Sequence, residues 1–269
     1  MQIITISRGS LRGAKQLAEN LSDEPGIPLY KREQIFEEAE KYSIADTGFC
    51  DISFIDRAPS IWERQSYRRK HYLLGFQAAL LDMASKGSFI YEGHLGQYLL
   101  SGIPFILRLR AIQKFENRVN YWEKENKVSH EHAVNYIKLI DERRRHWSDY
   151  LYGVNIEESM YYDLVINLET MNVGTAAKVV KTALEQPEFN SNDETMKIMN
   201  DLHLSALSKL YLHLSPVTRG LELDVISDSG IGEITIKGLD PQADPEKFEQ
   251  YIRNVLVALP AVQKVHFNY

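Results

Sequence analysis

Five short apolar runs recur along the first two thirds of the chain, and segments with helical periodicity separate them. Runs of this length that alternate with helices are typical of parallel strands buried on both faces of a sheet. The predicted strands cover residues 3–6, 27–30, 88–91, 105–109 and 164–167. The predicted helices cover residues 13–22, 32–42, 61–86, 111–125, 130–150 and 173–185. This order predicts a three-layer α/β domain with a five-stranded parallel sheet.

A polar segment at residues 186–194 ends this pattern. It contains Pro187 and ends in a helix-capping residue, Asn192 or Asp193, which is typical of a linker. Beyond it the pattern predicts a helix, two strands, a helix and a last strand at residues 195–214, 221–226, 233–237, 245–258 and 262–267. A turn at residues 228–230 joins the two strands as an antiparallel pair. We expect a larger domain, a linker and a small C-terminal α+β domain at residues 1–188, 189–194 and 195–269.

Composition limits the classes of protein that fit this chain. A net charge of −6 over 269 residues argues against a nucleic-acid partner. The single cysteine, Cys50, excludes an internal disulfide and suits a reducing compartment. No apolar run has the length of a membrane span, and the first residues lack the pattern of a secretion signal. We therefore expect a cytoplasmic protein.

The first predicted strand runs through a glycine-bearing turn into the first predicted helix. Such a connection points backbone N–H groups at an anion such as a nucleotide phosphate. The usual motif, G-x-x-x-x-G-K-[ST], is altered here: Gly9 and Gly13 lie one residue too close, and Gln16 stands where a magnesium-binding hydroxyl is expected. A solvated surface role is the alternative for Lys15. The candidate nucleotide-binding residues are Ser7, Arg8, Gly9, Ser10, Arg12, Gly13, Ala14, Lys15 and Gln16.

A second group of candidates lies in two later predicted helices. Asp141 precedes three arginines, at 143–145, which cannot all share one helix face, so at least one of them can reach a phosphate. Arg118 is placed as a further phosphate arginine. Exposed ion pairs on the helix surface are the alternative interpretation. This region is therefore the second candidate site.

One histidine is a further candidate, and the spacing of two others argues against a zinc site. His94 lies in a glycine-bearing turn after the third predicted strand, where it can touch a substrate or cap the turn. His130 and His132 lack the i, i+4 spacing of a helical zinc site. We therefore expect no metal ligand set built from histidines.

Several of these segments together resemble the cytidylate kinase-like family, a branch of the nucleoside monophosphate kinases with a P-loop fold. The resemblance covers residues 1–185 and lies in I-T-I-S-R at 4–8, L-A-E-N-L at 17–21 with G-I-P at 26–28 and Tyr30, E-G-H-L-G at 92–96, D-x-x-R at 141–144 and Y-D-L-V-I-N at 162–167. It implies a three-layer P-loop kinase fold, ATP and magnesium as cofactors, and a nucleoside monophosphate as acceptor.

The family pattern also assigns roles to residues. Its loop reads like G-S-G-G-R, and alignment through Leu17 places these positions at Leu11, Arg12, Gly13, Ala14 and Lys15. The resemblance implies that the catalytic residues are Lys15, Arg118, Asp141 and Arg144. It implies that the acceptor-binding residues are Lys31, Gly93 and His94, with Lys31 and His94 in place of an aspartate and an arginine.

The tail, residues 195–269, resembles a BON domain at 230–238 and 259–265. Domains of that type bind lipid, ligand or protein surfaces, so the resemblance implies a docking or regulatory role. Two hypotheses remain open. The first is an ATP-dependent kinase of CMP or a related monophosphate, and the alternative is a catalytically inactive, kinase-derived sensor or scaffold whose tail binds a partner. An oligomer is compatible with both.

Overall fold

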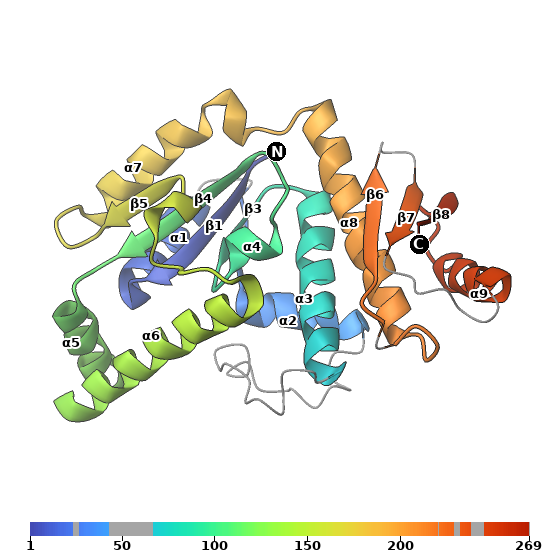
Figure 1. Cartoon of the computed structure of the whole chain (residues 1–269). Coiled ribbons are helices and arrows are strands. Elements are labelled where there is room, and N and C mark those ends of the chain that lie inside the picture. The colour runs from blue at the N-terminus through green and yellow to red at the C-terminus, as the bar shows by residue number, and fades with distance from the viewer. Residues whose placement is uncertain (24–26, 43–66, 220, 229–231, 238–244, 269) are drawn as a thin grey trace.

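The computed structural model describes residues 1–23, 27–42, 67–219, 221–228, 232–237 and 245–268. Its larger sheet has five strands, all parallel, in the order β2-β3-β1-β4-β5 (Figure 1). These strands are β1 (Ile3–Gly9), β2 (Leu29–Lys31), β3 (Phe89–Glu92), β4 (Ile106–Ile112) and β5 (Leu164–Asn167). The predicted α/β class and the five-stranded parallel sheet are confirmed.

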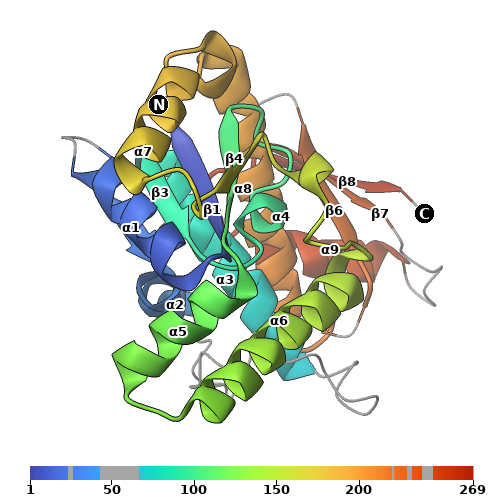
Figure 2. The ribbon, with the colours of Figure 1, turned by 90° about the vertical axis from the view of Figure 1, so that its left-hand side faces the viewer.

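Alternate residues of β1 face two separate cores. Ile4 and Ile6 pack with residues of α1 (Leu11–Ser22) and α7 (Val173–Leu184). Ile3 packs with residues of α2 (Arg32–Ala39) and α3 (Tyr67–Lys86). Figure 2 shows α1 and α7 on one side of the sheet and α3 on the other. Helices thus cover both faces, which is why the strands read as continuous apolar runs.

Two consecutive helices, α5 (Phe115–Asn126) and α6 (His130–Tyr152), form a hairpin. A small apolar cluster of Val119, Ala133 and Ile137 holds them together. The remaining elements of this part are short: η1 (Glu40–Tyr42), α4 (Gly96–Leu99), η5 (Ser159–Tyr161) and η6 (Pro187–Phe189). Among the described residues, no helix has the length and hydropathy needed to cross a membrane.

Several predicted boundaries were wrong. Helix α1 begins at Leu11 instead of residue 13, and α5 begins at Phe115 instead of residue 111 because β4 continues to Ile112. Helix α4 was not predicted, since four residues are too few for a periodic signal. Residues 61–66 of a predicted helix lie outside the described residues.

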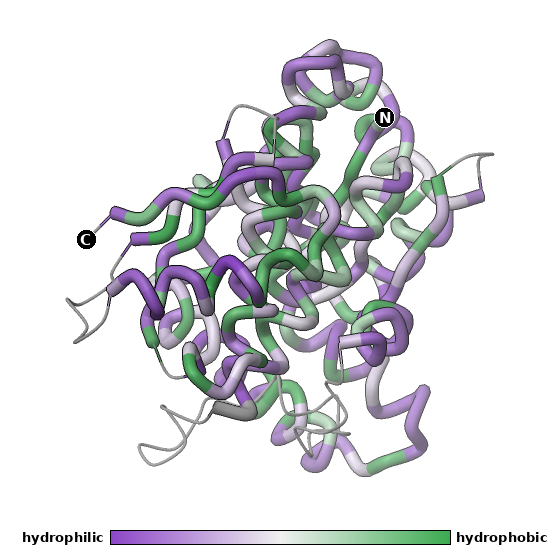
Figure 3. Tube along the Cα trace, turned by 90° about the vertical axis from the view of Figure 1, so that its right-hand side faces the viewer, coloured by the Kyte–Doolittle hydropathy of each residue, from purple (hydrophilic) through white to green (hydrophobic). Residues whose placement is uncertain are grey.

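The tail forms a second, three-stranded sheet in the order β6-β7-β8, as predicted for a small α+β unit. Its elements are α8 (Asp193–Leu214), β6 (Asp224–Asp228), β7 (Glu233–Lys237), α9 (Pro245–Leu256) and β8 (Lys264–Asn268). β6 pairs with β7 antiparallel and β7 with β8 parallel. Figure 3 shows hydrophobic and hydrophilic residues alternating along these elements, consistent with one buried face. Of the predicted turn, only Asp228 lies within the described residues.

Helix α8 belongs to both cores. Met199 and Ala206 pack with Phe76 of α3 in the core of the larger sheet. Leu204 and Leu212 pack under the small sheet. Figure 1 shows α8 between α3 and β6. The helix therefore ties the tail to the larger sheet by apolar burial.

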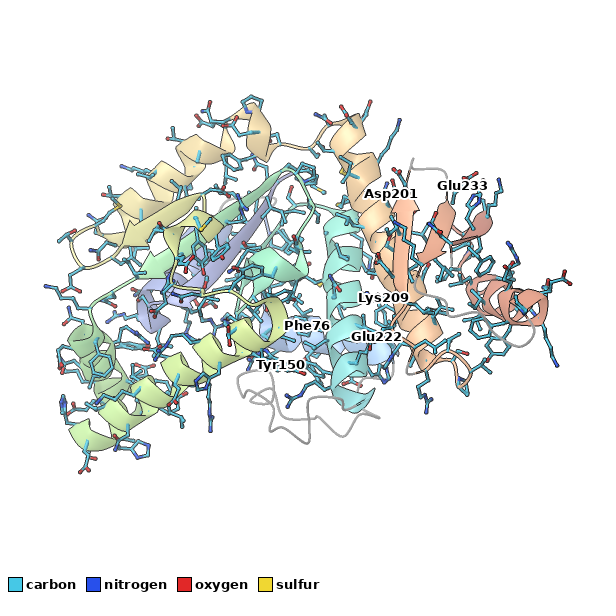
Figure 4. The ribbon with its side chains drawn as sticks, in the orientation of Figure 1. Phe76, Tyr150, Asp201, Lys209, Glu222 and Glu233 are labelled. Atoms are coloured by element: carbon cyan, nitrogen blue, oxygen red, sulfur yellow. The ribbon has the colours of Figure 1, made fainter. Side chains whose placement is uncertain are left out.

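Polar contacts strengthen the same attachment. Glu222 pairs with Lys70 of α3 at 2.6 Å, and Asp201 of α8 accepts a hydrogen bond from Ser227 Oγ at 2.8 Å; both carboxylates are labelled in Figure 4. The Met1 amino group donates to Ser191 Oγ at 2.9 Å, within the segment predicted as a linker. This segment is thus hydrogen-bonded to the start of β1.

Candidate functional site

The connection between β1 and α1 is a single residue, Ser10. β1 continues to Gly9 and α1 begins at Leu11. The buried Ser10 hydroxyl accepts a hydrogen bond from the Gly13 N–H at 3.0 Å and donates one to Gln113 Oε1 at 3.0 Å. A capped helix start stands where the sequence predicted a longer loop, and the cap already occupies one of the amides that an anion would use.

The two glycines of this junction lie where a side chain does not fit. A Cβ at Gly9 would lie 2.8 Å from the Ala111 carbonyl oxygen. A Cβ at Gly13 would lie 2.4 Å from Leu168 Cδ1 and 2.7 Å from Ser10 Oγ. Both glycines allow close packing of β1 and α1 against neighbouring elements. Packing therefore explains both without a ligand.

Three other predicted residues of α1 have contacts within the protein. Lys15 is about half exposed, and its Nζ lies 3.9 Å from Glu19 Oε1, one turn along the helix. The Arg12 guanidinium lies over the Tyr121 ring, 5.4 Å from its centroid. Ala14 is buried in the core between α1 and the sheet. These three side chains of α1 thus contact the helix itself, α5 and the core.

Beside this junction, at the carboxyl end of β1, lies a small polar hollow of about 40 Å³ that we call the arginine pocket. Side chains from β1, β4, α5 and α6 and from two connections converge on it. Its lining residues are Ser7, Arg8, Gly9, His94, Arg110, Arg118, Asp141, Arg144, Arg145, Ile156 and Glu157. The carboxyl end of a parallel sheet is where ligands bind in open α/β folds.

Arg8 is held by Glu92 at the end of β3. Its Nε lies 2.6 Å from Glu92 Oε1, and its Nη2 donates to Glu92 Oε2 at 3.0 Å. Burial raises the pKa of Glu92, and the neighbouring Arg8 opposes this change. Arg144 in turn donates to the Arg8 carbonyl oxygen at 2.8 Å. Through these contacts Arg8 of β1 links the end of β3 to α6.

Arg118 and Asp141 form a two-fold ion pair between α5 and α6. Arg118 Nη1 and Nη2 donate to the two carboxylate oxygens of Asp141 at 2.9 and 2.6 Å. Arg118 is 8% exposed and Arg144 7%, so both guanidinium groups have lost most of their water. Paired planar geometry of this kind is the strongest of the ionic hydrogen bonds. The pair fixes the hairpin above the sheet.

Arg110 extends from β4 into the same pocket. It donates to the Ile156 carbonyl oxygen, and its Nη2 lies 3.8 Å from Glu157 Oε1. Its guanidinium lies 5.7 Å from the centroid of the Tyr162 ring. Sequence reasoning missed Arg110, Ile156 and Glu157, whereas Arg145 belongs to the predicted arginine group at 143–145. A charged residue near the carboxyl end of a buried parallel strand was the available signal for Arg110.

Comparison with known proteins identifies the family of the chain. The model of the cytidylate kinase-like family matches residues 3–170, more than half of the chain. The chain belongs to the cytidylate kinase-like family. This membership supports a nucleotide-binding, kinase-like protein and confirms the family resemblance, whereas the resemblance of the tail to a BON domain has no such support.

A solved structure shares the fold. A crystal structure of an uncharacterized protein from Eubacterium ventriosum aligns with a TM-score of 0.55 and 19% sequence identity, covering 69% of this chain and 99% of that one. No curated protein matches the chain. At this identity the likeness concerns the fold alone.

The structure brings together only some of the site residues that the sequence predicted. Ser7, Arg8, Gly9, His94, Arg118, Asp141 and Arg144 line the arginine pocket. Lys15, Arg12, Gly13, Ala14 and Gln16 lie in α1 and are not among its lining residues. Ser10 lies between the two sets.

Of the predicted acceptor residues, only His94 enters the pocket. It is buried, and its Nε2 lies 3.4 Å from Ser148 Oγ. Burial, and then the charges of Arg144 and Arg32, hold its pKa well below 6.5, so the ring is neutral near pH 7. Lys31 instead precedes α2, with Nζ 3.9 Å from Glu19, and a Cβ at Gly93 would overlap the Tyr91 ring.

The magnesium that the family implies finds few ligands here. Among the described residues, no group of three His, Cys, Asp or Glu side chains is placed to hold a metal ion. The hydroxyl of Ser10 is used twice within the protein, and Gln16 occupies the usual hydroxyl position. Mg²⁺ at such sites keeps several waters and binds mainly through the substrate phosphates, so these residues offer no metal site independent of a bound nucleotide.

Proposed function

We propose that the protein binds a nucleotide with its phosphate in the arginine pocket and transfers a phosphoryl group from ATP to a nucleoside monophosphate. One observation carries this proposal: five arginines from four elements converge on one pocket at the carboxyl end of the parallel sheet. Phosphoryl transfer mainly requires that the protein position the phosphates and neutralise their charge. Guanidinium groups do both.

In this proposal Arg118 and Arg144 hold the transferring group, because both are desolvated and lie on the hairpin above the sheet. Asp141 orients Arg118 through their two hydrogen bonds. A phosphate oxygen of the acceptor forms a bond to the γ-phosphorus of ATP, the bond between that phosphorus and the β–γ bridging oxygen breaks, and ADP leaves with this oxygen. We derive no step through a metal ion, and Lys15 keeps only its role as a sequence prediction.

A second candidate function is nucleotide binding without turnover. The observation that favours it is the β1–α1 junction, where a single buried residue stands in place of a phosphate loop. Fewer backbone amides are then available for the β- and γ-phosphates of a triphosphate donor. In this case the protein would sense or store a nucleotide.

We also propose a BON-like role for the tail, as a docking unit for a protein or lipid surface, and a cytoplasmic location. The first proposal rests on the resemblance of residues 230–238 and 259–265 to a BON domain. The single cysteine supports the second. Binding of the full chain to lipid vesicles, compared with buffer alone, is a first test of the tail.

The experiment that tests the main proposal combines turnover with binding. Purified protein is incubated with MgATP and each of CMP, UMP, AMP and GMP, and diphosphate formation is followed while calorimetry measures binding. We expect diphosphate formation that Arg144→Gln abolishes and Arg143→Gln retains, because Arg143 lies on the same helix outside the pocket. Binding without diphosphate supports the second candidate. Absence of both overturns the proposal.

A further inference from the structure

The small sheet of the tail has two edges, and the protein covers them in different ways. Its order is β6-β7-β8, so β6 and β8 each have one side that pairs with no strand among the described residues. On the β6 side, the Ser227 N–H donates to Ser205 Oγ of α8 at 2.7 Å, and Ser227 Oγ donates to Asp201 at 2.8 Å. Helix α8 therefore covers the edge of β6. Figure 1 shows β8 at the other end of the sheet, beside α9.

One arginine of α9 lies along the edge of β8. Arg253 Nη1 donates to the Val265 carbonyl oxygen at 2.7 Å, and its guanidinium carbon lies 4.7 Å from the centroid of the Phe267 ring. Glu249, one turn earlier in α9, lies 3.6 Å from Arg253 Nη2. The Arg253 side chain is 40% exposed, so its charge also remains in contact with water. This side chain thus spans the outer side of β8 from Val265 to Phe267.

The hydrogen bond to Val265 identifies the backbone groups of β8 that point outward. Successive residues of a strand direct their N–H and C=O groups to alternate sides. The Lys264 N–H donates to the Gly232 carbonyl oxygen, on the β7 side, whereas the Val265 carbonyl faces Arg253. By the same alternation, the backbone groups of Phe267 also face away from β7. A row of such groups is a template for another strand, and a charged side chain at the edge is a common means of blocking it.

The side chains of β8 favour a second copy of the same strand as the partner. A two-fold axis at His266 defines an antiparallel pair in which Val265 lies opposite Phe267 of the other copy. In the same register Lys264 lies opposite Asn268. Apolar residues then face each other on the side of the core, and an ammonium group faces an amide on the open side. The core under the small sheet would continue from one copy into the other.

We infer that the outer edge of β8 is a self-association surface for a second copy of this chain, and that Arg253 keeps it closed. A second β8 strand has to displace the guanidinium group from the Val265 carbonyl, and both arginines of a symmetric pair lie at the same seam. Removal of the guanidinium group removes both obstacles. The inference is independent of nucleotide binding, because the residues that line the arginine pocket all precede the tail.

Sedimentation velocity of the full chain, over about a fortyfold range of concentration, tests this inference. Arg253→Met keeps an apolar stem over the Phe267 ring but removes the donors and the charge, and Arg253→Ala removes all three. We expect either variant to reach up to twice the average mass of the original chain, with a dimer Kd at least about tenfold lower. The control is Lys247→Ala, which removes one positive charge from the same helix and should keep the original mass.

A cysteine at the proposed two-fold axis tests the register. In a background of Cys50→Ser and Arg253→Met, His266→Cys should form a disulfide-linked dimer under mild oxidation. Directly opposite residues of a non-hydrogen-bonded antiparallel pair have Cα atoms about 4.5 Å apart, which a disulfide can span. Lys237→Cys, exposed on β7 one strand from the edge, should form no such dimer in the same background.

Thermal melting identifies the variants that keep the fold. A folded Arg253→Met or Arg253→Ala variant with the mass of the original chain at every concentration overturns the inference. Unfolding of both variants overturns it as well, because Arg253 would then only support the tail. Association without a cross-link at residue 266, or with equal cross-linking at residue 237, shows that the copies meet elsewhere and overturns pairing through β8.

Discussion

The β1–α1 junction and the arginine pocket lie side by side at the carboxyl end of β1, yet they offer an anion different binding groups. At the junction Ser10 caps the helix, and close packing excludes side chains at both glycines. In the pocket, guanidinium groups outnumber carboxylates, and two of them are nearly desolvated. An anion would therefore meet side-chain charge in the pocket, whereas the junction would offer it few free backbone amides.

The largest effect that would sharpen this contrast is expected at Gly13. A valine there would meet Leu168 and Ser10, so we expect Gly13→Val to lower the free energy of unfolding by about 3 kcal/mol. Urea denaturation measures this change in the free energy of unfolding. The control is Gly174→Val, whose Cβ would have only Asn172 Oδ1 nearby, at 3.5 Å. Equal effects at both glycines would contradict a packing role specific to the junction.

A somewhat smaller effect is expected in the pocket. Asp141→Ala leaves the buried Arg118 without its carboxylate, and we expect a loss of about 2 kcal/mol in unfolding free energy. Glu142→Ala, which removes an exposed charge from the same helix, should change it by less than about 0.5 kcal/mol. If the two variants melted alike, the ion pair would not support the hairpin.

Removing the helix cap at Ser10 should lower the free energy of unfolding by less than the Asp141 substitution does. Ser10→Ala deletes the hydroxyl that serves Gly13 and Gln113, and we expect a loss of about 1 kcal/mol, measured by urea denaturation. The affinity for CMP should stay within about twofold of the original, because this hydroxyl faces the protein. A tenfold loss of affinity with unchanged stability would return the phosphate site to the junction.

The smallest effect is expected for Lys15→Ala. Its ammonium group is half exposed beside Glu19, so stability should change by less than about 0.5 kcal/mol. The affinity for CMP, measured by calorimetry beside Arg144→Gln, should stay unchanged while the arginine variant loses it. If instead Lys15→Ala removed binding, the interpretation taken from the family motif would be right and the contrast between the two regions would fail.

The sequence predicted the fold better than the site. Short continuous apolar runs between segments of helical periodicity identified all five parallel strands, because burial on both faces leaves a strong local signal. It misplaced the start of α1, since the motif suggested a loop where Ser10 alone makes the turn. It named Arg118, Asp141 and the arginines at 143–145 but missed Arg110, whose place in the pocket depends on the approach of elements far apart in the chain.

The position of α8 has a consequence for any attempt to work with a shorter chain. One side of this helix completes the core under α3, and the other covers the small sheet. A fragment that ends before residue 193 would expose the apolar surface of α3 to water, and we expect it to aggregate during expression. The nucleotide-handling part and its tail should consequently melt together, as a single calorimetric transition.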